Sequence, residues 1–234
     1  MVKMAQTAEH EYAGVMCGIM DQFASMMGKK DHVIKLDCRS LAYEYVPFKL
    51  EGIKIVLLDT HVKHSLASSE YNTRRKECTQ GVAWVKEHEP AINYLRDVKE
   101  WMLDQYVLPK SDLIDKRSRF IVQEIQRLQE GCVDLNKGDI RSLGHKMFAT
   151  HDGLSRMYEV SCKELDFLVD FVRGNTAVIG ARMMGGGFGG SVIALVPGDA
   201  TPVRAAVCAA FEGQGWPAPG FLDAPPSDGA HRLG

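Results

Sequence analysis

An aspartate that follows a glycine and opens a short apolar run is the part of this sequence best suited to chemistry. Asp21 stands three residues after Gly18, and the apolar run that it opens closes at Gly28. The pattern predicts a loop, a short helix with Asp21 in its first turn, and a glycine stop. Free backbone N–H groups and the helix dipole favour negative charge there, so the carboxylate can orient a hydroxyl or a metal-bound phosphate. The spacing alone favours a simpler alternative, in which Asp21 only caps the helix.

A glycine-rich run at residues 185–190 is the second candidate. Its letters match the dinucleotide fingerprint G-x-G-x-x-G, but that site needs a helix after the glycines, and here the apolar strand-like run 191–196 follows. We therefore expect neither a Rossmann site nor a Walker loop. The run instead predicts a turn between two antiparallel strands, able to approach another backbone or a ligand closely. A purely structural turn stays open. The glycines concerned are Gly185, Gly186, Gly187, Gly189 and Gly190.

Tyr71 lies where a predicted buried strand leads into a helix, which is a common position for a site residue. Its phenol can hydrogen-bond a polar ligand, although by itself it is more typical of a core residue. The charged run Arg74-Arg75-Lys76 that follows is expected on a solvated helix face. The eight histidines show no metal-ligand spacing, and no nucleophile motif of the G-x-S-x-G type is found.

The composition is typical of a globular protein with one large domain or two modest ones. The chain has 234 residues, of which 45% are hydrophobic and 25% charged, and its net charge is −2. This balance gives no general attraction to nucleic acid or acidic lipid. No apolar run is long enough for a membrane span, and residues 1–11 lack the apolar core of a signal peptide. Six scattered cysteines indicate reduced, mostly buried thiols in a cytoplasmic protein, without disulfides or structural zinc.

The strands and helices that must position the candidate residues follow from periodicity and punctuation. A helix is expected over residues 3–14, and three β-branched or aromatic runs at 32–38, 43–47 and 53–59 predict a strand meander. The third run is apolar on both faces, which indicates a central buried strand. From 65 to about 174 the chain is expected to be helical, with breaks.

Several residues are predicted to begin or end these helices. The expected N-caps are Ser65, Ser68, Ser69, Ser111 and Asp139, residues 161–164 have the pattern of a capping box, and Pro90 and Pro109 are expected to end helices. A second amphipathic segment is expected over 95–108, and strands over 177–179 and 191–196. A last helix over 202–212 is followed by a Pro/Gly-rich tail without predicted structure, whose tip we expect to be mobile.

Taken together, these stretches resemble the galactokinase branch of the GHMP kinase family. The resemblance is carried, in order along the chain, by residues 18–25, 36–41, 64–71, 158–161, 164–166, 182–190 and 227–230. It implies an α/β (α+β) fold of the GHMP type. Residues 1–51 would be a remnant of the N-terminal domain, and residues 52–234 a C-terminal domain of antiparallel sheet packed with helices.

The resemblance also implies a reaction, the ATP- and Mg²⁺-dependent phosphorylation of the C1 hydroxyl of galactose. It gives Asp21 the role of catalytic partner of that hydroxyl, and it places Gly18 and Tyr71 against the sugar, with the glycine turn supporting the site. Phosphoryl transfer depends mainly on positioning and on neutralising charge, so one oriented carboxylate fits this role. Whether Asp21 takes the proton or only orients the hydroxyl stays open.

Two motifs of this family are not found in the sequence. One is the sugar-binding motif with a Glu-His-Thr-Asp-Tyr core and a preceding arginine, and the other is a Gly/Ser-rich phosphate loop. We therefore expect the chain to be the C-terminal part of such a kinase, partnered by a missing N-terminal segment and inactive alone. The alternatives are a non-catalytic sugar-binding or regulatory protein, and another small-metabolite kinase of the family.

Overall fold

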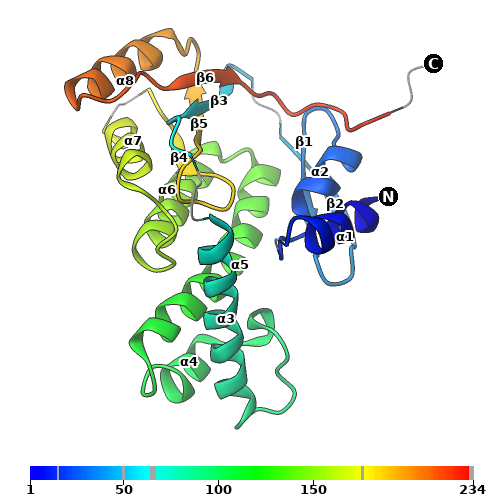
Figure 1. The fold of residues 1–234 in the computed structure, drawn as a ribbon. Helices are drawn as coiled ribbons and strands as arrows, with labels where there is room; N and C mark the ends of the chain where they lie inside the picture. Colours follow the sequence, from blue (N-terminus) through cyan, green and yellow to red (C-terminus); the bar gives the residue numbers. More distant parts are fainter. Residues whose placement is uncertain (15, 49–50, 64–66, 175–176, 232–234) are drawn as a thin grey trace.

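The structure, a computed structural model, describes residues 1–14, 16–48, 51–63, 67–174 and 177–231, with the side chains of 67–69 left out (Figure 1). The expected caps Ser65, Ser68 and Ser69 therefore fall outside the described side chains. The helices are α1 (Val2–Tyr12), α2 (Met20–Met27), α3 (Ala67–Lys86), a 3-10 turn (Leu95–Asp97), α4 (Glu100–Tyr106), α5 (Asp112–Lys137), α6 (Ile140–Arg156), α7 (Lys163–Arg173) and α8 (Thr201–Gly213). The strands are β1 (His32–Leu36), β2 (Tyr43–Pro47), β3 (Ile53–Asp59), β4 (Gly180–Met183), β5 (Ser191–Pro197) and β6 (Gly220–Asp223).

The described strands form two sheets, so the predicted meander is wrong for its third member. β1 and β2 pair with each other as an antiparallel hairpin, whereas β3 lies in a four-stranded sheet of order β4-β5-β3-β6. All pairs in the second sheet are antiparallel. The prediction that β3 is central and buried is confirmed, with Leu58 fully buried. A strand that is apolar on both faces must be covered on both faces, and a place inside the four-stranded sheet allows this.

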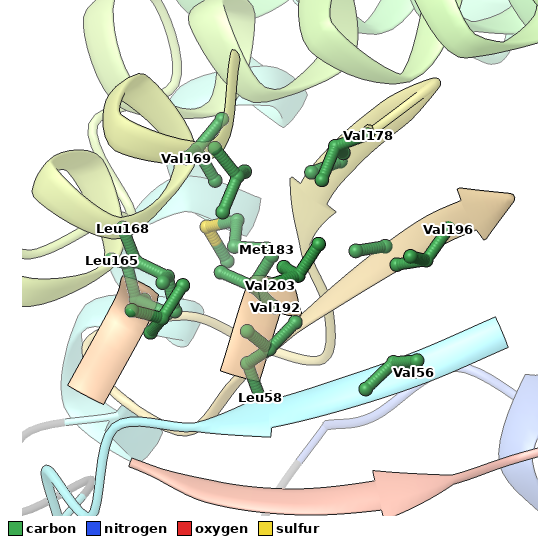
Figure 2. Close-up of a cluster of buried hydrophobic side chains, with 14 of the residues drawn as sticks. Val56, Leu58, Leu165, Leu168, Val169, Val178, Met183, Val192, Val196 and Val203 are labelled. Carbon is green, nitrogen blue, oxygen red and sulfur yellow. The ribbon is translucent and has the colours of Figure 1, made fainter. Parts of the chain in front are cut away.

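The main core lies between the four-stranded sheet and the helices α7 and α8. Figure 2 shows Leu165, Leu168 and Val169 of α7 meeting side chains of β4 and β5. On the other face of the sheet, Ile55 and Leu195 belong to a separate apolar cluster. The helices are thus held by burial of one apolar face each, as expected for amphipathic helices on a sheet.

Two of the predicted helix starts are confirmed and one is wrong. The Ser111 side chain accepts a hydrogen bond from the Ile114 N–H at 3.3 Å, and Asp139 Oδ1 accepts from the Ser142 N–H at 3.0 Å. The capping box at 161–164 does not form, because α7 begins one residue later, with Cys162 in the extended N-cap position. The Ser161 hydroxyl is buried and has no hydrogen-bond partner in the described part of the chain.

Residues 36–41, one of the stretches that carry the resemblance, make the turn of the β1–β2 hairpin. Asp37 accepts two hydrogen bonds from the Arg96 guanidinium, at 2.7 and 2.8 Å. Arg39 donates to Asp97 at 3.0 Å. These crossed pairs tie the hairpin to the 3-10 turn. The Arg96 hydrogen bonds hold the pKa of the Asp37 carboxyl well below its usual range, helped by the Ser40 and Arg39 N–H groups.

The C-terminal tail contains a strand that the sequence did not predict. β6 pairs with β3, and the chain then runs away from the sheet toward α2 (Figure 1). The strand is short and lies between prolines, so its pairing depends on the free edge of β3 rather than on local propensity.

All six cysteines are free thiols. Cys38 is exposed and the other five are half-buried, so their predicted burial is only partial. None of the helices in the described ranges has both the length and the apolar character that a bilayer crossing requires.

Candidate functional site

Asp21 stands in the first turn of α2, as the sequence predicts. The helix begins after Ile19, and Ile19 and Phe23 are its buried anchors, with 5% and 6% exposure. Asp21 itself is exposed, and its carboxylate makes no hydrogen bond or ion pair with any residue the structure describes. The alternative in which its side chain caps the helix by a hydrogen bond is therefore not seen, and the carboxylate is available to a ligand.

A groove of about 540 Å³ lies between α1 and α2 and includes Asp21. Glu9, Gln22 and Ser25 add polar groups to its lining. Gln22 Oε1 is buried and has no hydrogen-bond partner among the described residues. A buried acceptor without a partner costs about 1–3 kcal/mol. In the sequence, the only mark of Gln22 is its place beside Asp21.

The loop before Asp21 is held from two sides. On one side, His10 Nε2 donates to the carbonyl of Cys17 at 2.9 Å. On the other side, Arg75 of α3 donates to the carbonyl of Met16 at 3.0 Å. Gly18 is exposed, and a Cβ added there would meet no atom within 4 Å. The loop thus presents an open backbone next to the Asp21 carboxylate.

Tyr71 is half-buried near the start of α3, close to Tyr158. Burial raises the pKa of the Tyr158 phenol, and the neighbouring Cys78 and Tyr71 raise it further. Tyr71 is not among the described residues that line the Asp21 groove. The structure connects the two candidates through Arg75, which lies one helical turn after Tyr71 and binds the loop before Asp21.

The expectation that residues 74–76 lie on a solvated helix face is wrong for Arg74. Its side chain is buried, with 7% exposure, and it donates to the carbonyls of Tyr158 at 2.7 Å and Glu159 at 3.0 Å. Arg75 and Lys76 are exposed, as expected. The turn between α6 and α7 leaves carbonyls without helical partners, and such carbonyls need other hydrogen-bond donors. Arg74 supplies them.

A second buried arginine, Arg117 of α5, holds the same turn and was missed by the sequence analysis. It is 2% exposed, donates to Glu159 Oε2 at 2.7 Å and to Glu77 Oε2 at 3.2 Å, and binds the carbonyl of Met157. The burial of Arg117 could have been predicted from its spacing in the sequence. Arg117 lies three residues after Ile114 and four before Ile121, on an apolar helical stripe. A charge in such a stripe indicates a buried ion pair.

The turn between α6 and α7, residues 157–162, is called the hinge below. The glycine turn packs against this hinge and against the residues that follow β3. The Phe188 N–H donates to the carbonyl of Val160 at 2.7 Å, and the Gly190 N–H donates to that of Val62 at 3.2 Å. A Cβ on Gly187 would collide with the Val160 carbonyl, and one on Gly189 with the Val62 carbonyl.

The turn joins antiparallel strands, as predicted, but the first of them is β4 at Gly180–Met183, and the strand expected over 177–179 is not formed. Its close approach is to the protein's own backbone at Gly187 and Gly189, whereas Gly185 and Gly186 face open space.

The described residues contain no group of three or more His, Cys, Asp or Glu side chains that could hold a metal ion. In the glycine turn, the N–H groups of Met184, Phe188 and Gly190 are already bonded to carbonyls of the chain itself.

Comparisons with known proteins agree on one family. Residues 133–213 match the family described as GHMP kinases C terminal. The chain is 48% identical over 195 residues to a galactokinase of Thermotoga neapolitana, covering 83% of this chain and 53% of the relative. It is 41% identical over 236 residues to a galactokinase of Limosilactobacillus fermentum, covering all of this chain and 60% of the relative.

A solved structure, Lactococcus lactis galactokinase complexed with galactose, superimposes on this chain with a TM-score of 0.91. It is 34% identical, and the match covers 99% of this chain and 60% of that chain. The chain thus spans between about half and three fifths of the length of the relatives that it matches.

Proposed function

Since this chain carries the C-terminal domain of the GHMP kinases, we propose that it supplies part of the sugar site of a galactokinase, which transfers the γ-phosphoryl group of ATP to the C1 hydroxyl of galactose. The fold class implied by the sequence resemblance, helices packed on antiparallel sheets in the GHMP arrangement, is confirmed. The observation that carries the functional proposal is the match over 99% of the chain to a galactokinase solved with galactose.

In this proposal, Asp21 is the catalytic residue. Its exposed carboxylate has no competing partner in the described structure, so it accepts a hydrogen bond from the C1 hydroxyl and orients that oxygen. Gly18 lets the sugar approach the loop backbone, because it has no side chain and no described atom lies within 4 Å of where a Cβ would be. Tyr71 offers a phenol hydroxyl to the sugar.

In this proposal the glycine turn supports the sugar site through other elements and does not contact the sugar itself. The Phe188 N–H binds it to the Val160 carbonyl, the absence of a side chain at Gly187 allows this close approach, and the same α6–α7 turn is held by Arg74 of the helix that carries Tyr71. ATP and Mg²⁺ are proposed to bind residues outside the described ones, in the part of the relatives that this chain does not match. Galactose is the small-molecule partner, in a cytoplasmic enzyme without nucleic-acid or membrane partners.

We further propose that the chain divides near residue 51. The support is that β1 and β2 pair only with each other among the described strands, whereas β3 and every later described strand belong to the second sheet. On this division, Asp21 lies in the first unit and Tyr71 in the second, so the sugar site is built from both.

The test is a hybrid chain in which the unmatched part of the L. fermentum galactokinase precedes this sequence. We expect the hybrid to form galactose 1-phosphate from galactose and ATP, and Asp21→Asn in the hybrid to lower kcat by at least about a hundredfold, since an oriented general base contributes about 10²–10⁴-fold. Gly213→Ala, in an open position far along the chain at the end of α8, is the matched control.

Two outcomes would contradict the proposal. The first is a folded hybrid that binds galactose but shows no turnover, which would favour the non-catalytic sugar-binding alternative. The second is unchanged turnover in the Asp21→Asn hybrid, which would remove Asp21 from the chemistry.

A further inference from the structure

The last described residues of the chain bind the end of the helix that carries Asp21. We call residues 227–230 the strap. The Gly229 N–H donates to the carbonyl of Gly28 at 2.9 Å, and the Ala230 N–H donates to that of Ser25 at 2.8 Å. In the opposite direction, the Lys30 N–H donates to Asp228 Oδ1 at 2.9 Å. Three hydrogen bonds thus join the strap to Ser25 in the last turn of α2, to its C-cap Gly28 and to Lys30.

Two glycines allow the strap and the helix to touch. A Cβ on Gly229 would lie 2.7 Å from the Met26 carbonyl oxygen, and a Cβ on Gly28 would lie 2.9 Å from the Ser227 carbonyl oxygen. Neither glycine has a positive φ; Gly28 has a φ of −51°. The sequence therefore predicted the glycine stop at the right place for a different reason, because Gly28 is needed for space and not for a left-handed conformation.

The strap is important for the position of α2 because this helix has few other contacts that hold it. The helix has eight residues, and Phe23 is its one fully buried member. The neighbouring α1 has no buried residue. At the C-terminal end of α2, the Tyr45 hydroxyl donates to the Met27 carbonyl at 2.8 Å, and the strap supplies the remaining described hydrogen bonds to other elements. A short helix is marginal without tertiary contacts, so its end is fixed mainly by these groups.

At its other end the strap is continuous with the four-stranded sheet. Asp223 of β6 lies opposite Val56 of β3, and the Ala224 N–H donates to the Ile55 carbonyl at 2.9 Å. Only residues 225 and 226 separate this pairing from the strap. The position of α2 is therefore coupled to the sheet that also carries the glycine turn (Figure 1).

We propose that the strap is a positioning element for Asp21, in which Asp228 and Gly229 fix α2 relative to the four-stranded sheet. This inference rests on the proposed function for its catalytic meaning, but its structural part can be tested without any sugar. Asp228 and Gly229 touch neither Asp21 nor, in the proposal, the substrate; they act through the helix.

The test is amide hydrogen exchange of α2 and Lys30 in this chain. Asp228→Ala removes the acceptor of the Lys30 N–H, whereas Asp228→Asn keeps an acceptor oxygen at the same place. Gly229→Ala blocks the close approach, and Gly213→Ala, which has no atom within 4 Å of its added Cβ, is the control. We expect Asp228→Ala and Gly229→Ala to speed exchange in α2 about tenfold or more, and Asp228→Asn and Gly213→Ala to match the parent.

The result that overturns the proposal is faster exchange in the strap itself with unchanged exchange in α2, because the strap would then detach without affecting the helix. In the hybrid described above, Asp228→Ala is expected to lower kcat while the KM for galactose stays within about twofold, and Asp228→Asn to restore kcat. Faster exchange in α2 with unchanged kcat would also overturn the positioning role. An inactive parent hybrid would count against the proposed function, and the exchange data would still decide whether the strap fixes α2.

Discussion

Arg117 offers the sharpest test of how the hinge between α6 and α7 is held. The change is Arg117→Met, which keeps most of the aliphatic volume of the side chain and removes its charge. In the parent, the guanidinium bonds to Glu77, to Glu159 and to the Met157 carbonyl. These contacts join α3, α5 and the hinge, on which the glycine turn rests through the Val160 carbonyl.

The expected loss follows from burial. The Arg117 side chain is 2% exposed and that of Glu77 is 14% exposed, so the pair is largely shielded from water. Without Arg117, the Glu77 carboxylate keeps Arg74, at 3.3 Å, as its one ion-pair partner among the residues that the structure describes. Removing one partner of a buried ion pair costs about 3–5 kcal/mol, and we expect Arg117→Met to lower the free energy of unfolding by that amount.

The assay is equilibrium unfolding in urea, with Lys116→Met as the matched control. Lys116 is the neighbouring residue, and it pairs with Asp112 across one helical turn at 2.8 Å, but these side chains are 46% and 70% exposed. An exposed pair of this kind contributes little to stability, because water screens the two charges. If Arg117→Met were no more destabilising than Lys116→Met, with equal m-values, the claim that the arginine supports the hinge would be refuted.

Two further predictions concern the glycine turn and the hairpin. Gly187→Ala should destabilise the chain by about 2–4 kcal/mol in urea unfolding, through strain at its φ of +89° and collision with Val160, whereas Gly186→Ala should change stability by less than about 0.5 kcal/mol; equal effects would refute this. Because Arg96 lowers the folded-state pKa of Asp37, that contribution to stability is present above about pH 4 and is lost as the pH falls toward the folded pKa. Asp37→Asn should therefore show a shallower loss of stability between pH 5 and 3, and parallel curves would contradict it.

The features that the sequence predicted correctly depend on neighbours along the chain. The first-turn position of Asp21, the caps at Ser111 and Asp139 and the antiparallel strands around the glycine turn all follow from spacing within a few residues. The central position of β3 was also predictable, since a strand that is apolar on both faces has to be covered on both. These are local choices of backbone conformation and burial.

The features that it did not predict depend on partners far along the chain. Arg74 lies in a charged run, and it is buried because it binds the carbonyl of Tyr158, 84 residues later. Asp228 binds Lys30 across 198 residues. A charged side chain can be buried only where hydrogen-bond partners surround it. The order of residues within the charged run does not show whether such partners are present. Arg117 was the exception, because its place on an apolar stripe was visible.

The contacts that hold the candidate site share one chemical feature, which is that most of them end on a backbone oxygen. Arg75 binds the Met16 carbonyl in the loop before Asp21, Arg74 binds two carbonyls of the hinge, and the strap binds the carbonyls of Ser25 in α2 and of its C-cap Gly28. Backbone acceptors do not depend on which side chain stands at their position, so the geometry is set by the donor side. A guanidinium can serve two carbonyls with a fixed fork, whereas a lysine ammonium is a single compact charge and cannot span both in the same way. The arrangement of α2, α3 and the glycine turn therefore depends on a few arginines and on the close packing at Gly28, Gly187 and Gly229, and much less on the residues whose carbonyls they bind.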